Sequence, residues 1–230
     1  DTRYSVADYK IDAEKAIEKI ISKGKIPIIV GGTGLYVDSL IYGIEYPEIE
    51  FDEEYRRKLE KEADEDGLEN LYNKAKEIDE QAMQKISIND RKRIIRVLEI
   101  YHATGKNKTE QEKESRKKEV KYDYKIFAIN MDREKLYERI NIRVDRMIEN
   151  GLIEEVENLQ KKYNHFPTAM QGLGYKEVIE YLQSQITREE MIEKIKQESR
   201  RYAKRQLTWF RKNKQTIWLD GLANLEDNIN

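Results

Sequence analysis

The sequence predicts an α/β fold, in which helices flank a parallel sheet and a small all-helical domain is inserted into that core. Two observations carry the prediction. A β-branched run at residues 26–30 is typical of a strand covered on both faces, and a glycine-rich turn follows it directly. Residues 52–104 show helical periodicity throughout, with much charge and few glycines. The expected division is a core of residues 1–47 and 120–230 and a helical insertion, with its connector, of residues 48–119.

The composition excludes several classes of protein. The 230 residues contain no cysteine, which excludes disulfides, thiol catalysis and cysteine zinc sites. The two histidines, His102 and His165, lie far apart in the sequence, and we predict no metal ligands among the side chains. Charged residues make up 38% of the chain, but the net charge is only −2, so a nucleic-acid site must be a local patch. Without cysteine, a signal peptide or a run long enough to span a membrane, we expect a cytoplasmic protein. We also expect it to be a monomer.

The first half of the chain is predicted to be mostly helical. A helix begins at a capping box, Ser5 to Asp8, and ends at Gly24. After the glycine turn, a short helix continues to about residue 42. Residues 107–120 are polar and charge-rich, and we expect a mobile connector there. The insertion itself is predicted to hold three helices, at about residues 52–65, 68–75 and 90–104, the last capped by Asn89.

The second half returns to the core. Residues 125–131 have strand character, and Asp132 caps the helix that follows them. Two glycines in the stretch 167–177 indicate a loop that another group approaches closely. The remaining predicted elements are helices at about residues 133–150, 152–163 and 188–212 and a last strand at residues 216–219.

The glycine turn is the first candidate site. Gly31, Gly32 and Gly34 remove Cβ atoms where the backbone turns sharply and where a ligand would come close. Ligands of open α/β sheets bind beyond the carboxyl ends of strands, and Thr33 is the one polar side chain among these glycines. The alternative is a plain strand-to-helix turn with a threonine cap.

Three basic stretches are candidate anion sites. Lys92, Arg93 and Arg96 share one helix face, for which a solvated surface is the alternative interpretation. Arg139, Arg143 and Arg146 form a ridge suited to phosphate, and the alternative is a set of surface salt bridges. Seven basic residues and no acid lie between residues 200 and 214. Five of them, Arg200, Arg201, Lys204, Arg205 and Arg211, fall on one arc of a helix, which is the electrostatic pattern expected for binding a polyanion.

Taken in order, these stretches resemble the tRNA dimethylallyltransferases, also called tRNA isopentenyltransferases, along nearly the whole chain. The matching pieces are Tyr4-Ser5-Val6-Ala7-Asp8-Tyr9, Gly31-Gly32-Thr33-Gly34-Leu35-Tyr36, Asn89-Asp90-Arg91-Lys92-Arg93-Ile94-Ile95-Arg96, Leu136-Tyr137-Glu138-Arg139-Ile140 with Arg143-Val144-Asp145, Gly172-Leu173-Gly174-Tyr175-Lys176-Glu177 and Arg201-Tyr202-Ala203-Lys204-Arg205-Gln206-Leu207-Thr208-Trp209-Phe210-Arg211.

The resemblance implies a P-loop-NTPase-like, nucleotide-binding core and a reaction. Such enzymes move a dimethylallyl group from dimethylallyl diphosphate, with Mg²⁺ serving the diphosphate, to the exocyclic amine of the adenosine just 3′ of the anticodon in certain tRNAs. Arginine and a divalent cation neutralise a leaving diphosphate, and a target base must leave its stack to reach a buried donor. The tRNA anticodon stem-loop is therefore the implied macromolecular partner.

The resemblance also implies roles for single residues. Thr33 would hydrogen-bond at the reacting centre. Arg143, together with Gly31 and Gly32, would bind the diphosphate. The side chains implied to contact tRNA are Arg56, Lys92, Arg93 and Arg96 in the insertion and Gln171, Gly174, Tyr175, Lys176, Lys204, Arg205, Gln206, Thr208, Trp209 and Arg211 in the core. One departure is Gln171-Gly172-Leu173, where relatives often have Gln-Ala-Ile.

A larger departure concerns the phosphate-binding loop of the family, which has the form G-x-x-x-x-G-K-[ST]. Neither Gly24-Lys25 nor Gly105-Lys106 has the earlier glycine and the following hydroxyl residue that this form requires. We expect a chain without the family's first strand and loop, inactive by itself, with apolar surface exposed at residues 26–30. Two other functions remain open, an adenine-nucleotide isopentenyltransferase and a non-catalytic RNA-binding remnant.

Overall fold

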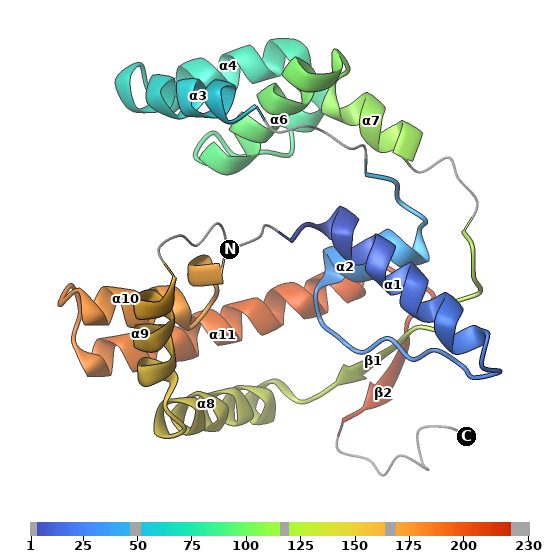
Figure 1. Ribbon diagram of the computed structural model, residues 1–230, viewed down its shortest axis with the longest axis vertical. Helices are drawn as coiled ribbons and strands as arrows, with labels where there is room; N and C mark the ends of the chain where they lie inside the picture. Colours follow the sequence, from blue (N-terminus) through green and yellow to red (C-terminus); the bar gives the residue numbers. More distant parts are fainter. Residues whose placement is uncertain (1–3, 47–51, 116–119, 164–168, 222–230) are drawn as a thin grey trace. The chain divides into compact units, whose positions relative to one another are not determined.

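The computed structural model describes residues 4–46, 52–115, 120–163 and 169–221 (Figure 1). His165 and the first residues of the loop predicted at 167–177 lie outside these ranges, as do residues 116–119 of the predicted connector. The chain forms two compact units. The core unit comprises Asp1–Tyr9, Ala16–Val37 and Asp123–Asn230, and the insertion unit comprises Lys10–Lys15 and Asp38–Tyr122.

Helices make up most of both units. The capping box predicted at the first helix is confirmed, because the Ser5 side chain accepts from the backbone N–H of Asp8 and the Asp8 side chain accepts from that of Ser5. The helices of the first half are α1 (Val6–Ile21), α2 (Gly34–Ile41), α3 (Glu53–Glu65), α4 (Leu68–Ile78), α5 (Glu80–Met83), α6 (Arg91–Thr104) and α7 (Lys108–Ser115). The second half holds β1 (Phe127–Asn130), α8 (Arg133–Glu149), α9 (Leu152–Lys162), the 3₁₀ turn η1 (Ala169–Gln171), α10 (Tyr175–Leu182), α11 (Arg188–Phe210) and β2 (Ile217–Asp220).

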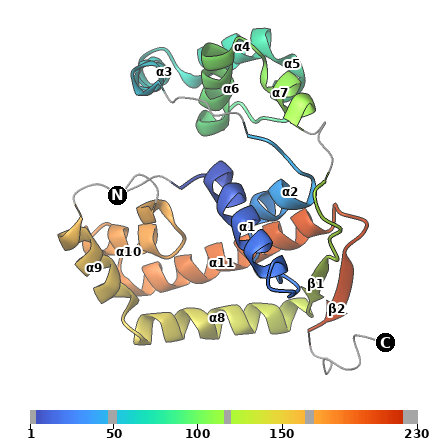
Figure 2. The ribbon, with the colours of Figure 1, turned by 45° about the vertical axis from the view of Figure 1, so that its right-hand side comes forward.

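The sheet of the described residues is a parallel pair. Strand β1 pairs with β2 in the register Phe127 to Ile217 and Asn130 to Asp220, and Figure 1 and Figure 2 show the two strands side by side. The intervening helices α8 to α11 make the long crossover that two parallel strands require. Parallel pairing agrees with the predicted α/β class, although the observed sheet is small.

Residues 26–30 do not form a strand, and this part of the prediction was wrong. Ile26, Ile28 and Val30 keep 87%, 82% and 90% of their surface exposed, whereas a strand buried on both faces was expected. A strand exists only through hydrogen bonds to a neighbour, and among the described residues none pairs with this run. The expected exposure of apolar surface here agrees with these values.

Two boundaries in the insertion differ from the sequence-based prediction. Asp90, not Asn89, is the N-cap of α6, because its carboxylate accepts from the backbone N–H of Arg93 at 3.1 Å. Part of the predicted connector is the helix α7, whose first turn is capped by Asn107. The Asn107 side chain accepts from the backbone N–H of Glu110 at 2.8 Å.

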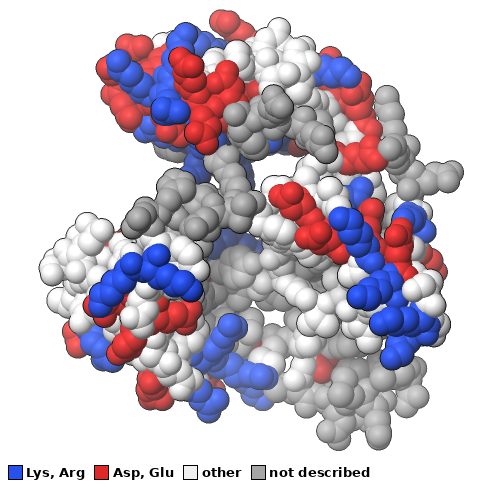
Figure 3. Space-filling view, in the orientation of Figure 1, with Lys and Arg blue, Asp and Glu red and all other residues white. Residues whose placement is uncertain are grey.

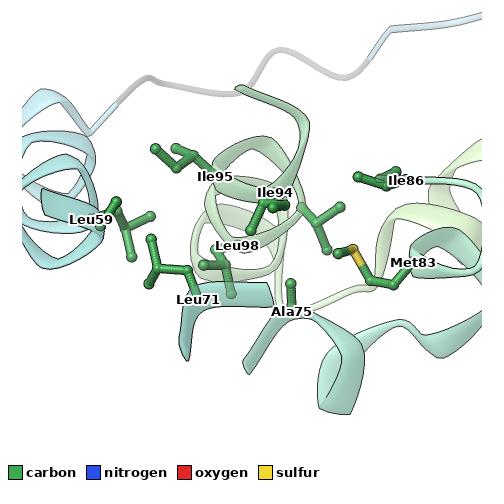
Figure 4. Close-up of a cluster of buried hydrophobic side chains, with 10 residues drawn as sticks. Leu59, Leu71, Ala75, Met83, Ile86, Ile94, Ile95 and Leu98 are labelled. Carbon is green, nitrogen blue, oxygen red and sulfur yellow. The ribbon is translucent and has the colours of Figure 1, made fainter. Parts of the chain in front are cut away.

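Each unit has its own apolar core. In the core unit, α8, α9, α10 and α11 bury one cluster: Val144, Ile148, Leu152, Val156, Met170, Val178, Met191 and Ile195. In the insertion unit, α3, α4 and α6 bury a second one, shown in Figure 4: Leu59, Ala63, Leu71, Ala75, Met83, Ile86, Ile94, Ile95, Val97 and Leu98. Among the helices that the structure describes, none is both long enough and apolar enough to cross a lipid bilayer.

Candidate functional site

The glycine turn at residues 31–34 starts helix α2. The carbonyl oxygen of Thr33 accepts hydrogen bonds from the backbone N–H groups of Tyr36 at 2.9 Å and Val37 at 3.1 Å, so Thr33 closes the first turn of the helix. The Thr33 residue is exposed, and a Cβ atom added at Gly31 would meet nothing within 4 Å. This part of the turn is therefore open to an incoming molecule.

Helix α11 holds the other side of the turn. The Nε2 group of Gln206 donates a hydrogen bond to the carbonyl oxygen of Gly32 at 2.9 Å. A Cβ atom at Gly32 would lie 2.0 Å from that Nε2, and one at Gly34 would lie 2.3 Å from Cδ1 of Trp209. Gly34 is thus required by the Trp209 ring of α11, and a side chain at Gly32 would have to displace the end of Gln206, whereas the sequence assigned the close approach to a ligand.

The predicted diphosphate residue Arg143 lies on α8, which packs against α11. The Arg200 guanidinium of α11 donates from Nη1 to Oδ1 of Asn141 on α8 at 2.6 Å. Gln206 lies six residues further along α11, which corresponds to about 9 Å of helix. Helix α11 therefore contacts both α8 and the glycine turn within the core unit. Figure 2 shows the two long helices, α8 and α11, side by side.

Arg143 itself is exposed, as are Arg139 and Arg146, which confirms an arginine ridge on the solvent side of α8. Among the described residues, these three arginines make no ion pair. The alternative interpretation, a set of surface salt bridges, therefore does not describe the ridge. Arg143 follows Asn141 by two residues, about 200° around the helix, and so points away from α11. A shared site of Arg143 and Thr33 stays a prediction.

The carboxyl-terminal end of α11 is the basic surface that the sequence predicted. Lys204, Arg205 and Arg211 are exposed. The Arg205 guanidinium lies 5.6 Å from the ring centroid of Tyr202, and that of Arg211 lies 5.9 Å from Trp218. These stacked contacts hold the cations at the surface without neutralising them. The Thr208 hydroxyl already donates its proton to the carbonyl oxygen of Lys204 at 2.9 Å, so this proton is not available for a hydrogen bond to RNA.

The loop before α10 is shaped by a buried carboxylate. Gly174 has φ +95°, and its backbone N–H donates to Oε2 of Glu177 at 2.8 Å. Glu177 is fully buried, and the ammonium of Lys176 lies 3.2 Å from its Oε1. The Tyr175 hydroxyl donates to Glu155, and this hydrogen bond raises the pKa of the tyrosine. Gln171 is exposed at the other end of the loop.

The four basic residues predicted in the insertion divide into two pairs. Lys92 and Arg93 are exposed on α6, and Arg93 lies 3.4 Å from the carboxylate of Asp90. Arg56 of α3 and Arg96 of α6 instead face the buried carboxylate of Glu99, at 3.0 and 3.7 Å. Over this unit Figure 3 shows basic side chains interspersed with acidic ones, so no uniformly positive face exists on the side in view.

The sequence did not reveal Glu99 or the pairs on either side of it. Arg91 and Asp64 form one ion pair, which lowers the pKa of Asp64, and His102 Nε2 lies 3.1 Å from Oδ2 of Asp52. The three contacts join α3 and α6 in antiparallel order. The available signal was Glu99, which follows Arg96 by three positions on α6, but its burial depends on how α3 packs.

A model of the IPP transferase family matches residues 1–213. The chain is 50% identical to the tRNA dimethylallyltransferase of Acetivibrio thermocellus over 221 residues, which cover 96% of this chain and 71% of that protein. The chain belongs to the IPP transferase family. The relative from Halothermothrix orenii, also a tRNA dimethylallyltransferase, is 47% identical, with 96% of this chain and 67% of that protein covered.

Solved structures of IPP transferases agree with this assignment. The full-length tRNA isopentenylpyrophosphate transferase of Bacillus halodurans is 38% identical and superposes with a TM-score of 0.66, covering 98% of this chain and 70% of that one. A eukaryotic dimethylallyltransferase acting on tRNA is 29% identical with a TM-score of 0.74, covering 99% of this chain and 60% of that one. This member of the IPP transferase family is thus a prenyltransferase by class.

The described residues of this IPP transferase do not offer a built metal site. In the part of the chain that the structure describes, no three His, Cys, Asp or Glu side chains gather closely enough to hold a metal ion. Mg²⁺ usually binds through one or two protein groups together with substrate phosphates, so a magnesium ion bound with the diphosphate stays a prediction.

Proposed function

We propose that this IPP transferase transfers a dimethylallyl group from dimethylallyl diphosphate to the exocyclic amine of the adenosine that follows the anticodon in tRNA. One observation supports the proposal most directly. The helix α11 holds the glycine turn through Gln206, and the neighbouring residue Arg205 belongs to its exposed basic surface. A single helix thus joins the turn that the family places at the reacting centre to a surface suited to RNA phosphates.

In the proposed reaction the bond between the allylic carbon and the diphosphate oxygen breaks, and the electron pair leaves with the diphosphate. A bond forms between that carbon and the exocyclic nitrogen, which then loses one proton to an acceptor. The exposed Thr33 hydroxyl would hydrogen-bond at the reacting centre, and Arg143 would bind the leaving diphosphate. Mg²⁺ is proposed to arrive with the diphosphate, as part of the substrate.

The tRNA is proposed to bind as an anticodon stem-loop on two surfaces. In the core unit these are the residues of the α11 end, Lys204, Arg205 and Arg211, together with the loop from Gln171 to Lys176. In the insertion unit they are Lys92 and Arg93, with Arg56 and Arg96 behind them. Splayed bases of RNA loops are commonly bound by basic and aromatic groups of this kind. The protein is proposed to act as a cytoplasmic monomer.

The test measures binding of a synthetic tRNA anticodon stem-loop at several salt concentrations. Arg205→Glu and Arg211→Glu each remove one contact to phosphate, so affinity should fall about tenfold and the salt slope by about one. Lys161→Glu is the matched control, because it makes the same charge change on the exposed side of α9. Equal loss in the control, or unchanged affinity in both variants of α11, would contradict the assignment. Transfer is measured separately with labelled dimethylallyl diphosphate.

A further inference from the structure

The insertion unit contains a buried carboxylate that the reaction does not use. Glu99 lies on α6 within an otherwise apolar run, and only 6% of its surface is exposed. Its Oε1 accepts a hydrogen bond from Nη1 of Arg56 at 3.0 Å, whereas Oε2 lies 3.7 Å from Nη1 of Arg96. A buried charge is retained only where partners compensate its desolvation, and Arg56 is the arginine that is hydrogen-bonded to Glu99.

Arg56 is held by two different carboxylates. Its Nε donates to Oε1 of Glu60 at 3.0 Å, and its Nη1 donates to Glu99. These two hydrogen bonds use Nε and Nη1 and come from different edges of the guanidinium, unlike a bidentate pair with one carboxylate. The third nitrogen, Nη2, makes no hydrogen bond to the described residues. The Arg56 side chain is 29% exposed, so part of it is accessible to solvent.

The two carboxylates differ in a way that assigns them different roles. The side chain of Glu60 is 42% exposed, and that of Glu99 is 7% exposed. An incoming phosphate can replace an exposed carboxylate, which moves into water at little cost, but not one that is packed inside the helical unit. Glu60 is therefore the exchangeable partner of Arg56 and Glu99 the permanent one.

We propose that Glu99 is a positioning residue for RNA binding, which holds the Arg56 guanidinium so that its remaining Nη2 donors meet an RNA phosphate. This inference rests on the proposed function, since it takes the insertion unit as a tRNA-binding surface. Ordering an arginine side chain before the RNA arrives reduces the entropy that binding must otherwise lose. Arginine is suited to the role because its fork offers donors on two edges at once, which a lysine ammonium does not.

The test compares Glu99→Gln with Glu60→Gln in binding of the synthetic anticodon stem-loop. Both variants remove one negative charge beside Arg56. A purely electrostatic role would raise RNA affinity in both. The proposal instead predicts opposite signs: Glu99→Gln weakens binding about threefold or more, because Arg56 loses its fixed partner, and Glu60→Gln leaves affinity equal or higher. Equal or higher affinity in Glu99→Gln overturns the proposal.

Two further variants separate positioning from folding. Glu99→Gln in an Arg56→Gln background should cause no additional loss of affinity, since the partner through which Glu99 acts is gone. A loss of the same size in both backgrounds would mean that Glu99 supports the fold alone and would reject the proposal. Arg56→Lys keeps the charge but replaces the fork by a single ammonium, so it should bind the stem-loop more weakly than wild type, and wild-type affinity contradicts the proposal.

The two hypotheses fail in different ways. If the wild-type chain does not bind the stem-loop, the proposed function is wrong. If the wild-type chain binds and Arg205→Glu weakens binding, but the Arg56 and Glu99 variants bind like wild type, only the positioning role is wrong.

Discussion

The side-chain amide of Gln206 donates to the carbonyl oxygen of Gly32 at 2.9 Å and joins two residues that are 174 positions apart. Three positions further along α11, Trp209 lies against Gly34, where a Cβ atom would come within 2.3 Å of the indole ring. Gly32 and Gly34 thus lie against α11 at two points, and this packing can be tested by substitution.

Gly34→Ala should destabilise the protein by about 1–3 kcal/mol, because the added methyl group must displace a bulky indole ring. Chemical denaturation followed by tryptophan fluorescence measures the change. Gly31→Ala is the matched control, since a Cβ atom there meets nothing within 4 Å, and its stability should be unchanged or slightly higher. Similar losses in both variants would contradict the packing explanation.

The buried carboxylate of Glu177 should be important for the loop before α10. Glu177→Ala leaves the Gly174 N–H without its acceptor, and we expect a loss of about 2 kcal/mol or more in the free energy of unfolding. Glu177→Gln retains an acceptor oxygen, so its loss should be smaller. The control is Glu157→Gln on the exposed side of α9, which should change stability by less than about 0.5 kcal/mol. A Glu177→Ala variant as stable as wild type would contradict this role.

Asp79 should make the insertion unit sensitive to acid. Burial raises the pKa of Asp79, but hydrogen bonds from the backbone N–H of Ala82 and from Thr109 together bring it below its ordinary value. A carboxylate with a lowered folded-state pKa stabilises the fold fully above about pH 4, and this contribution is lost as the pH falls through the folded-state pKa.

Asp79→Asn should therefore lower stability by about 1–3 kcal/mol at pH 7 and show a smaller further loss between pH 5 and pH 3 than wild type. Urea midpoints at the three pH values measure both effects. Thr109→Ser, which keeps both donors to Asp79, is the control and should follow the wild-type pH profile. An unchanged acid sensitivity in Asp79→Asn would show that other carboxylates govern it.

The apolar run at residues 26–30 should lower solubility. Ile28 is 82% exposed, so Ile28→Lys removes exposed apolar surface without removing buried contacts. We expect less aggregation in light scattering and a melting temperature within about 2 °C of wild type. A clear fall in the melting temperature would mean that this side chain is buried in solution, for example by a second copy of the chain.

Features set by neighbouring residues could be predicted from the sequence. The capping box of Ser5 and Asp8 and the cap at Asp132 involve donors within three positions, and both are present. The strands near residues 127 and 217 and the long basic helix were found for the same reason, because their patterns are strong within one segment. The family was identified from the order of such segments.

Features that depend on distant residues could not be predicted. The run at residues 26–30 has the composition of a strand, but a strand needs a neighbour that the local pattern does not supply. The helix α7 has no apolar face, and it begins where Asn107 caps it and where Asp79, thirty positions away, binds Thr109. Likewise, the contacts of Gln206 and Glu99 follow from how helices pack. The resemblance gave Gln206 a role in binding tRNA, and the sequence did not single out Glu99.

The contact of Gln206 with Gly32 also limits how α11 can move. A shift of the helix by one residue, about 1.5 Å along its axis, would break this hydrogen bond and drive the ring of Trp209 away from its seat on Gly34. The bond between Arg200 and Asn141 opposes the same displacement at α8. Axial sliding of α11 is therefore opposed at both ends of this segment, once at α8 and once at the glycine turn.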